Sequence, residues 1–210
     1  MNLKLKQYIL LLSFVLLSTL TFSQNRTSIW KGQFAFGANF PSSNGFVENF
    51  EANSLNFPTI NIGIQNMFKP KFGAKLDYGY NRISSSDNSP EFKLNYSRIN
   101  AQLVYDPNSA ITFLPRNMAI IAHGGPGMSF VKPLGNFAKN KLSYFNVMAG
   151  LEFHYGISET FSVYLDTSYI LGFSKDFDPV TDGYGSFNGD LFTVTLGISF
   201  SLSGCQYCDE

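Results

Sequence analysis

The sequence carries little charge. Its 210 residues include 15 Lys and Arg against 15 Asp and Glu, so charged side chains make up 14% of the chain, against roughly 25% in an ordinary soluble domain. Without a basic excess the chain cannot neutralise phosphates, which excludes a nucleic-acid binder. Aromatic residues make up 16%, which excludes a disordered chain, because disordered segments lack large apolar side chains.

Long hydrophobic runs are also scarce. The apolar stretch Ile9–Leu20 is shorter than the ~20 residues of a transmembrane helix. Lys4 and Lys6 precede it, and Thr21-Phe22-Ser23 follows it with small residues at the two positions that a signal peptidase reads. We therefore predict a signal peptide over residues 1–23 that is cleaved after Ser23, with an uncleaved N-terminal anchor as the weaker alternative.

Cysteine is nearly absent. Cys205 and Cys208 form one CxxC pair in the C-terminal tail, residues 203–210. A zinc site would need two further ligands that the sequence does not supply nearby, and a redox motif would need a βαβ setting. In an oxidising compartment the pair would form a small disulfide or stay free. The last long loop has only a few acidic residues, Asp176, Asp178 and Asp182. We therefore expect no metal and no cofactor.

The sequence is rich in apolar residues at every second position. In residues 72–81, for example, aromatic and aliphatic residues alternate with Gly, Lys, Asp and Asn. This period of two indicates strands with two different faces, and no stretch after Ser23 keeps a helical period. The pattern predicts eight strands, over Ile29–Phe40, Thr59–Met67, Phe72–Asn81, Arg98–Tyr105, Met118–Val131, Phe145–Ile157, Phe161–Leu171 and Phe192–Leu202.

Two places break the alternation. Leu94 and Tyr96 lie in the phase opposite to the apolar residues that follow them in the same strand, which predicts a bulge near Ser97. The run Gly124–Gly127, with Pro126 inside it, interrupts the fifth strand, which predicts a bulge or a bend there.

The connections between the strands suggest the topology. Long loops (41–56, 84–92, 132–141 and 174–190) and tight turns (69–71 and 158–160) nearly alternate, and only 106–117 is intermediate. Long loops at one rim and tight turns at the other are typical of outer-membrane barrels. The polar faces carry mostly Gly, Asn, Ser and Gln, which suits a narrow, filled interior. We therefore predict an all-β protein, an eight-stranded antiparallel up-and-down transmembrane β-barrel over residues 24–202. The alternative is a secreted soluble ligand-binding β-barrel with its apolar faces turned inward.

Four segments resemble outer-membrane β-barrel families common in Bacteroidota, including PorT-like and OmpX-like proteins. The resemblance implies eight strands, residence in the bacterial outer membrane among lipid and lipopolysaccharide, and insertion by the barrel-assembly machinery. The chain departs from these families because residues 203–210 follow the last strand. The segments are HGGPGMSF (His123–Phe130), VMAGLEFHYGIS (Val147–Ser158), VYLDTSYILGF (Val163–Phe173) and TVTLGISFSL (Thr193–Leu202).

Charged side chains fall on the polar faces of the predicted strands. In the narrow lumen of an eight-stranded barrel they must pair, because an unpaired buried charge is costly. We interpret them as an internal polar plug, here called the lumen network, and leave the phase of His123 open because its strand is irregular. The members of the lumen network are Lys75, Asp77, Arg98, Glu152, His154 and Asp166.

An enzyme is poorly supported by the sequence. A lipid-A-modifying outer-membrane enzyme is a distant alternative, since Glu152 and His154 share a face. Such an enzyme also needs a nucleophile within reach of the histidine, and the sequence marks no particular serine. We therefore expect a non-enzymatic protein with a structural or surface-interaction role.

The long first and last loops are the predicted contact surface. They would face outside the cell, because an even number of strands places both chain ends on the tight-turn side. Aromatic side chains in these loops are candidate anchors for a protein partner, and they are Phe46, Phe50, Phe177, Tyr184 and Phe187.

Overall fold

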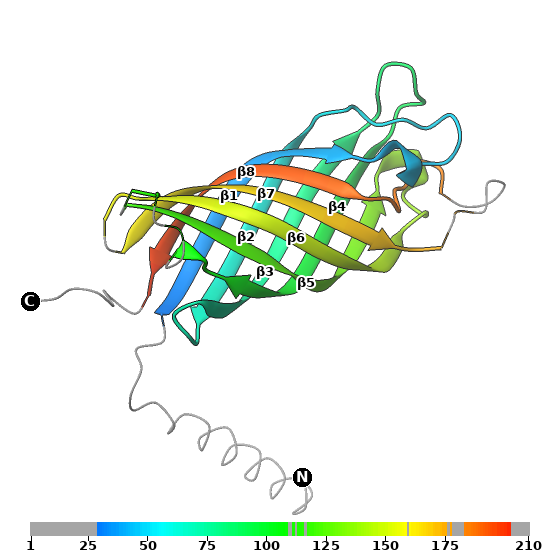
Figure 1. Ribbon diagram of the computed structural model, residues 1–210. Helices are drawn as coiled ribbons and strands as arrows, with labels where there is room; N and C mark the ends of the chain where they lie inside the picture. The colour runs from blue at the N-terminus through cyan, green and yellow to red at the C-terminus, as the bar shows by residue number, and fades with distance from the viewer. Residues whose placement is uncertain are drawn as a thin grey trace, which may run out of the picture.

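The computed structural model describes residues 29–108, 111, 113–115, 117–158, 160–175, 177 and 183–202. Its strands form one closed antiparallel barrel in which each strand pairs with the next and β8 pairs with β1 (Figure 1). The predicted fold, a closed eight-stranded antiparallel β-barrel, is confirmed. The predicted signal peptide and the Cys205–Cys208 pair lie outside the described residues. The strands are β1 (Ile29–Pro41), β2 (Asn56–Met67), β3 (Phe72–Ser84), β4 (Lys93–Tyr105), β5 (Met118–Pro133), β6 (Leu142–Gly156), β7 (Phe161–Phe173) and β8 (Leu191–Ser201).

The alternation in the sequence becomes the outside and the inside of the wall. In β3, Leu76 and Tyr78 keep 53% and 42% of their surface exposed, while Asp77 between them keeps 3%. In β6, exposed Leu151 and Phe153 flank the buried Glu152 in the same way. The apolar face of the strands therefore points away from the barrel, and the polar face points into the lumen.

The two ends of the barrel differ. The start of β1 and the end of β8 lie at the same end as the connections 68–71 and 157–160 (Figure 1). The connections 42–55, 85–92 and 134–141, and residues 174, 175, 177 and 183–190 of the last connection, lie at the opposite end. We call these the tight-turn end and the long-loop end. Among the described residues, no helix is both long and apolar enough to cross a membrane.

The predicted bulge near Ser97 is wrong. β4 pairs with β3 in one unbroken register, from Tyr105 opposite Phe72 to Lys93 opposite Ser84. Leu94 and Tyr96 are fully buried on the same inward face as Arg98. The alternation changes phase because the lumen itself changes from polar to apolar toward the long-loop end.

The Gly124–Gly127 run does not contain a bulge either. β5 pairs with β6 without a shift from Met118 to Val131, and its register with β4 is the same on both sides of the run. The β4–β5 ladder lacks pairs only opposite Gly125 and Pro126, where proline has no N–H to donate. The register shift in the barrel lies instead in β1 toward β2, between Gly37 and Asn39.

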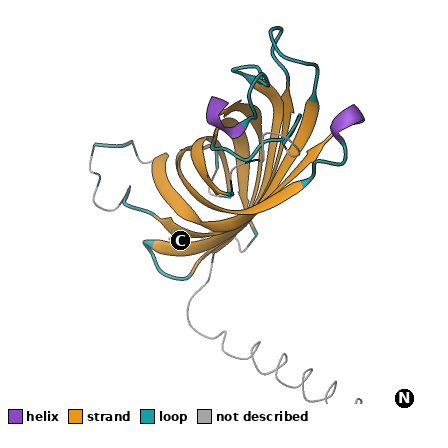
Figure 2. Cartoon of the chain, turned by 90° about the vertical axis from the view of Figure 1, so that its right-hand side faces the viewer, coloured by secondary structure: helices purple, strands orange, loops and turns teal. Residues whose placement is uncertain are grey.

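Apolar side chains close the long-loop end from inside. Loops contribute Val47, Phe50 and Phe187 to this group, and Phe46 packs on it with its ring 4.9 Å from that of Phe187. Figure 2 looks toward this end, where the loops and two short helices, η2 (Ser43–Gly45) and η4 (Gly135–Phe137), gather around the mouth. We call this group the mouth cluster, and it comprises Val47, Phe50, Ile83, Phe92, Leu94, Tyr96, Val131, Tyr144, Met148, Ile170, Phe187 and Leu191.

Candidate functional site: the polar lumen

Glu152 receives donors from across the lumen. It lies on β6 and has no exposed surface. Lys75 Nζ on β3 donates to its Oε1 at 2.5 Å, and Gln33 Nε2 on β1 donates to its Oε2 at 3.0 Å. His154 Nε2 also donates to Oε2, at 2.7 Å. Side chains from three strands that are not neighbours in the barrel thus meet at one carboxylate, whose charge Lys75 neutralises.

Arg98 is the second centre of charge. Its side chain is fully buried, and Nη1 lies 2.9 Å from Asp77 Oδ2. Its guanidinium also donates to Asn100 Oδ1 at 3.1 Å and to Asn61 Oδ1 at 3.2 Å. Gly79 faces Arg98 in the β3–β4 register and leaves it room, since a Cβ there would lie 2.8 Å from Arg98 Nε. The pair therefore meets the requirement that buried ions have both a counter-ion and further hydrogen bonds.

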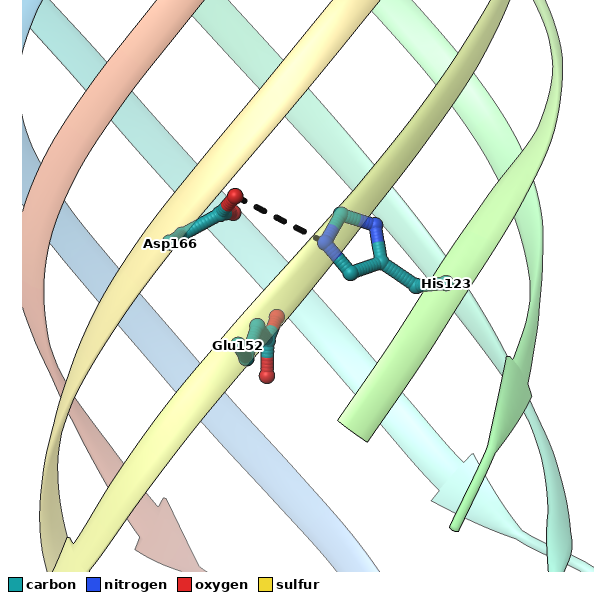
Figure 3. A group of neighbouring side chains, drawn as sticks. All are labelled: His123, Glu152 and Asp166. Atoms are coloured by element: carbon teal, nitrogen blue, oxygen red, sulfur yellow. Dashed lines mark ion pairs between the residues drawn. The ribbon is translucent and has the colours of Figure 1, made fainter. Parts of the chain in front are cut away.

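A chain of hydrogen bonds sets the orientation of His123. The Gln102 amide donates to the Asp77 carboxylate, so the Gln102 carbonyl must face His123. His123 Nδ1 donates to that carbonyl at 2.5 Å, so that in the neutral ring the lone pair is on Nε2. Nε2 makes no hydrogen bond and faces Asp166 Oδ1 at 3.6 Å (Figure 3). Asp166 accepts one hydrogen bond from Ser168 Oγ at 2.5 Å.

A cavity of about 560 Å³ opens at the tight-turn end and reaches His154. Lys31, Asp106 and Ser162 also line it. His154 Nε2 donates to Glu152, and in the neutral ring Nδ1 then accepts from Ser162 Oγ at 3.0 Å. The ring of His154 stacks on that of Tyr164, with centroids 4.9 Å apart. A hydroxyl, an imidazole and a carboxylate thus lie in one line of contacts, the arrangement that activates a nucleophile.

All six residues of the predicted lumen network lie buried inside the barrel. Lys75 and His154 contact Glu152, and Arg98 pairs with Asp77. Asp166 faces His123. The sequence did not single out the amides and the hydroxyl that complete these contacts. Their positions on the polar faces follow from the alternation, but a neutral side chain in a strand gives no sign that it contacts a buried charge. These residues are Gln33, Asn61, Asn100, Gln102 and Ser162.

The predicted loop anchors need correction. Phe187 is fully buried and Phe50 is 8% exposed, both within the mouth cluster. Phe46 and Phe177 are half-buried against that cluster, so these four side chains face the barrel and are not free anchors for a partner. Tyr184 remains 37% exposed, with its ring 5.6 Å from that of Phe50. The loop aromatics pack inward because the open mouth of the barrel gives them apolar surface to bury.

Comparisons with known proteins show the fold. No family model matches the sequence, and no curated protein matches it. Among solved structures, a major outer membrane protein from Thermus thermophilus superposes with a TM-score of 0.58 at 10% sequence identity. The alignment covers 84% of this chain and 100% of that protein. Neisserial surface protein A has a TM-score of 0.56 at 9% sequence identity, and the alignment covers 83% of this chain and 97% of that protein. Outer membrane protein OprG from Pseudomonas aeruginosa has a TM-score of 0.52 at 11% sequence identity, and the alignment covers 84% of this chain and 97% of that protein. At these identities the likeness is one of fold alone.

Proposed function

We propose that the protein is an integral outer-membrane β-barrel with a closed lumen and a non-enzymatic role, either structural or as an interaction surface outside the cell. One observation carries the proposal, which is that the polarity of the barrel is inside out. Charged and amide side chains fill the interior, while aliphatic and aromatic side chains such as Leu76, Leu165 and Leu196 cover the outside. Water would disfavour this distribution, whereas a lipid surrounding stabilises it.

The aromatic side chains of the outer face support the same environment. Near the tight-turn end, the rings of Phe72 and Tyr105 lie 5.2 Å apart, and Trp30 is 45% exposed. Near the long-loop end, Phe145 and Phe173 form another exposed pair, with centroids 5.9 Å apart. Two aromatic girdles that flank an apolar band are typical of outer-membrane barrels, where such rings sit at the level of the head groups.

Two layers inside the barrel support a closed lumen. The contacts of Glu152 with Lys75 and Gln33 cross the lumen from wall to wall. The Arg98 contacts join β2, β3 and β4, and the mouth cluster fills the long-loop end. An eight-stranded barrel leaves room for little more than such side chains. On this proposal, lipid and lipopolysaccharide surround the wall, and the barrel-assembly machinery inserts it. Any protein partner meets the outer loops, and the resemblance to PorT-like and OmpX-like proteins fits this role.

The alternatives have weaker support. A soluble ligand-binding barrel needs an apolar cavity. The interior seen here is polar below the mouth cluster and is occupied by its own side chains. The contacts of Ser162, His154 and Glu152 are the observation that favours an enzyme. However, Ser162 lies in a strand that is paired on both sides, so the backbone N–H groups around it are held in the ladder instead of forming an oxyanion hole.

Expression of the full precursor tests the proposal. We expect the protein in isolated outer membranes, with a mobility on SDS gels that changes when the sample is boiled. Leu196 lies midway between Phe192 and Phe200 on β8 and is 65% exposed. Leu196→Arg places a charge near the centre of the apolar band, which costs about 2–4 kcal/mol in a bilayer, and should reduce the amount of folded barrel. Asn88→Arg, in an exposed loop, is the matched control.

A soluble periplasmic protein without the mobility change would contradict the membrane location, as would a Leu196→Arg variant that accumulates like Asn88→Arg. The closed lumen has its own test in planar lipid bilayers. We expect no steady conductance from the purified protein, whereas a steady conductance would refute the closed lumen and leave the membrane location standing.

A further inference from the structure

Three side chains that can bind a metal meet in the lumen. His123, Glu152 and Asp166 come from the neighbouring strands β5, β6 and β7 and are all buried. One potential ligand atom from each lies within 4.8 Å of the others. Figure 3 shows the imidazole reaching over β6 toward the carboxylate of Asp166.

In its neutral form, His123 is held in the tautomer that a metal ligand requires. Its Nδ1 proton is donated to Gln102, whose own amide is fixed by Asp77. The His123 side chain is fully buried, and its Nε2 lone pair has no hydrogen-bond partner. A buried acceptor without a partner is unfavourable and calls for an explanation, such as a bound ion. A histidine that ligates a metal commonly uses its other nitrogen to hydrogen-bond a carbonyl or a carboxylate in this way.

The distance from His123 Nε2 to Asp166 Oδ1 is compatible with a shared metal ion. The two atoms are 3.6 Å apart, which is too far for a hydrogen bond from a protonated imidazole. Two ligands of one tetrahedral Zn²⁺, each about 2.1 Å from the ion, lie about 3.4 Å apart. The observed separation is close to that of two ligands of one ion.

The balance of charge also leaves room for a cation. Among the buried residues that the structure describes, Lys75 and Arg98 are positive, whereas Asp77, Glu152 and Asp166 are negative. With both histidines neutral, the network is one negative charge in excess, which either a proton on His123 or a bound cation would offset. Arg98 pairs with Asp77 and Lys75 pairs with Glu152, so the excess resides on Asp166, next to the bare lone pair of His123.

Gly150 makes the space that this arrangement needs. It lies on β6 between His123 and Ser168, its partners in the two ladders. A Cβ at this position would lie 2.6 Å from the His123 ring and 2.3 Å from Ser168 Oγ. The imidazole can cross β6 and approach Asp166 only because residue 150 has no side chain.

We propose that the lumen binds one divalent transition-metal ion between His123 Nε2 and the Asp166 carboxylate. Glu152, whose oxygens accept from Lys75, Gln33 and His154 in this structure, would become the third ligand by turning one oxygen toward the ion. One imidazole and two carboxylates are a donor set that suits Zn²⁺. The bound ion would join β5, β6 and β7 from inside. This proposal goes beyond the proposed function and does not depend on it, because it requires only the interior of the barrel.

Direct metal titration tests the site. The mature full-length chain, without a polyhistidine tag, is folded in detergent and titrated with Zn²⁺ against a chromophoric chelator. Cys205→Ser and Cys208→Ser are introduced in all proteins, because free thiols at the C-terminus would bind zinc themselves. Co²⁺ serves as a second probe, and its visible absorption reports ligand number. We expect one equivalent of metal per barrel and a tetrahedral Co²⁺ spectrum.

Variants then locate the ligands. Asp166→Asn and His123→Gln should each weaken Zn²⁺ binding at least about tenfold, and Gln102→Leu should weaken it by about 10–100-fold, because Gln102 orients the imidazole from outside the ligand set. Asp106→Asn, an acid that lines the tight-turn cavity, is the matched control and should bind like the parent. Heat-dependent gel mobility shows whether each variant is folded.

Less than a tenth of an equivalent of Zn²⁺ in the parent protein would overturn the proposal whatever the variants do. Equal losses of binding in Asp166→Asn and Asp106→Asn would also overturn it, since the binding would then be unspecific. If His123→Gln does not fold, Asp166→Asn and Gln102→Leu still decide the outcome.

Discussion

Replacing Arg98 by methionine tests whether paired charges hold the lumen together. Methionine keeps an unbranched apolar stem, so the change removes mainly the guanidinium group. Arg98 is fully buried and makes hydrogen bonds of 2.9–3.2 Å to Asp77, Asn61 and Asn100. Its loss leaves the Asp77 carboxylate in the lumen with only the Gln102 amide as a donor. Breaking a buried ion pair on one side costs about 3–5 kcal/mol, and we expect Arg98→Met to lower the free energy of unfolding by that amount.

The double variant Arg98→Met/Asp77→Asn distinguishes the cost of losing the ion pair from the cost of leaving one charge unpaired. It removes both charges and leaves no unpaired anion, so it should be at least about 1 kcal/mol more stable than Arg98→Met alone. Urea unfolding in phospholipid vesicles measures both, with heat-dependent gel mobility and the fluorescence of Trp30, the single tryptophan, as readouts. Lys93→Met is the control on the same strand. Its side chain is 57% exposed, so it should cost no more than about 1 kcal/mol. A double variant no more stable than the single one would refute the reasoning.

Three further substitutions examine other parts of the barrel. Phe187→Ala removes a fully buried ring from the mouth cluster and should lower the free energy of urea unfolding by about 3–5 kcal/mol. Tyr184→Ala, at a 37% exposed position, should change this free energy far less. Equal effects would show that the cluster does not stabilise the mouth. Gly79→Ala places a Cβ 2.8 Å from Arg98 Nε and should cost about 1–3 kcal/mol in the same assay, and a neutral result would mean that Arg98 is free to move. Ser162→Ala should leave the mass spectrum of lipid A unchanged in cells that express the barrel, and a difference between this variant and the parent would contradict the non-enzymatic role.

The strands could be predicted because each position in the wall has one of two environments. Leu76 and Tyr78 face outward and Asp77 faces inward, so a simple alternation of residue types carries the fold. The same logic failed at Leu94 and Tyr96. There the lumen becomes apolar near the mouth, and an apolar residue no longer identifies the outer face. Pattern reasoning cannot separate these two cases without knowing how far along the barrel axis a residue lies.

The contacts of the lumen could be predicted only in part. Charge identified Lys75 and Glu152 as inward-facing, but their meeting depends on the curvature of the closed sheet, which brings β3 opposite β6. The position of the loop aromatics depends on the same closure. Phe187 lies in the last long loop, and nothing local in the sequence indicates that its side chain packs into the mouth. The roles of Gln102 and Ser162 arise from partners on other strands, so neither residue stands out in its own segment.

The donors around Glu152 have a consequence for how the barrel forms. Gln33 and Lys75 are separated from Glu152 by 119 and 77 positions along the chain, and they reach it only across the lumen. In an open, half-curled sheet Glu152 would remain a charge without these partners, on a surface that faces lipid or water. The hydrogen bonds from Gln33 and Lys75 appear only when the opposite walls meet, in the same step that pairs β1 with β8. Pairing of β1 with β8 is therefore expected as an all-or-none event. A partly assembled, open sheet lacks these hydrogen bonds and is not stabilised as an intermediate.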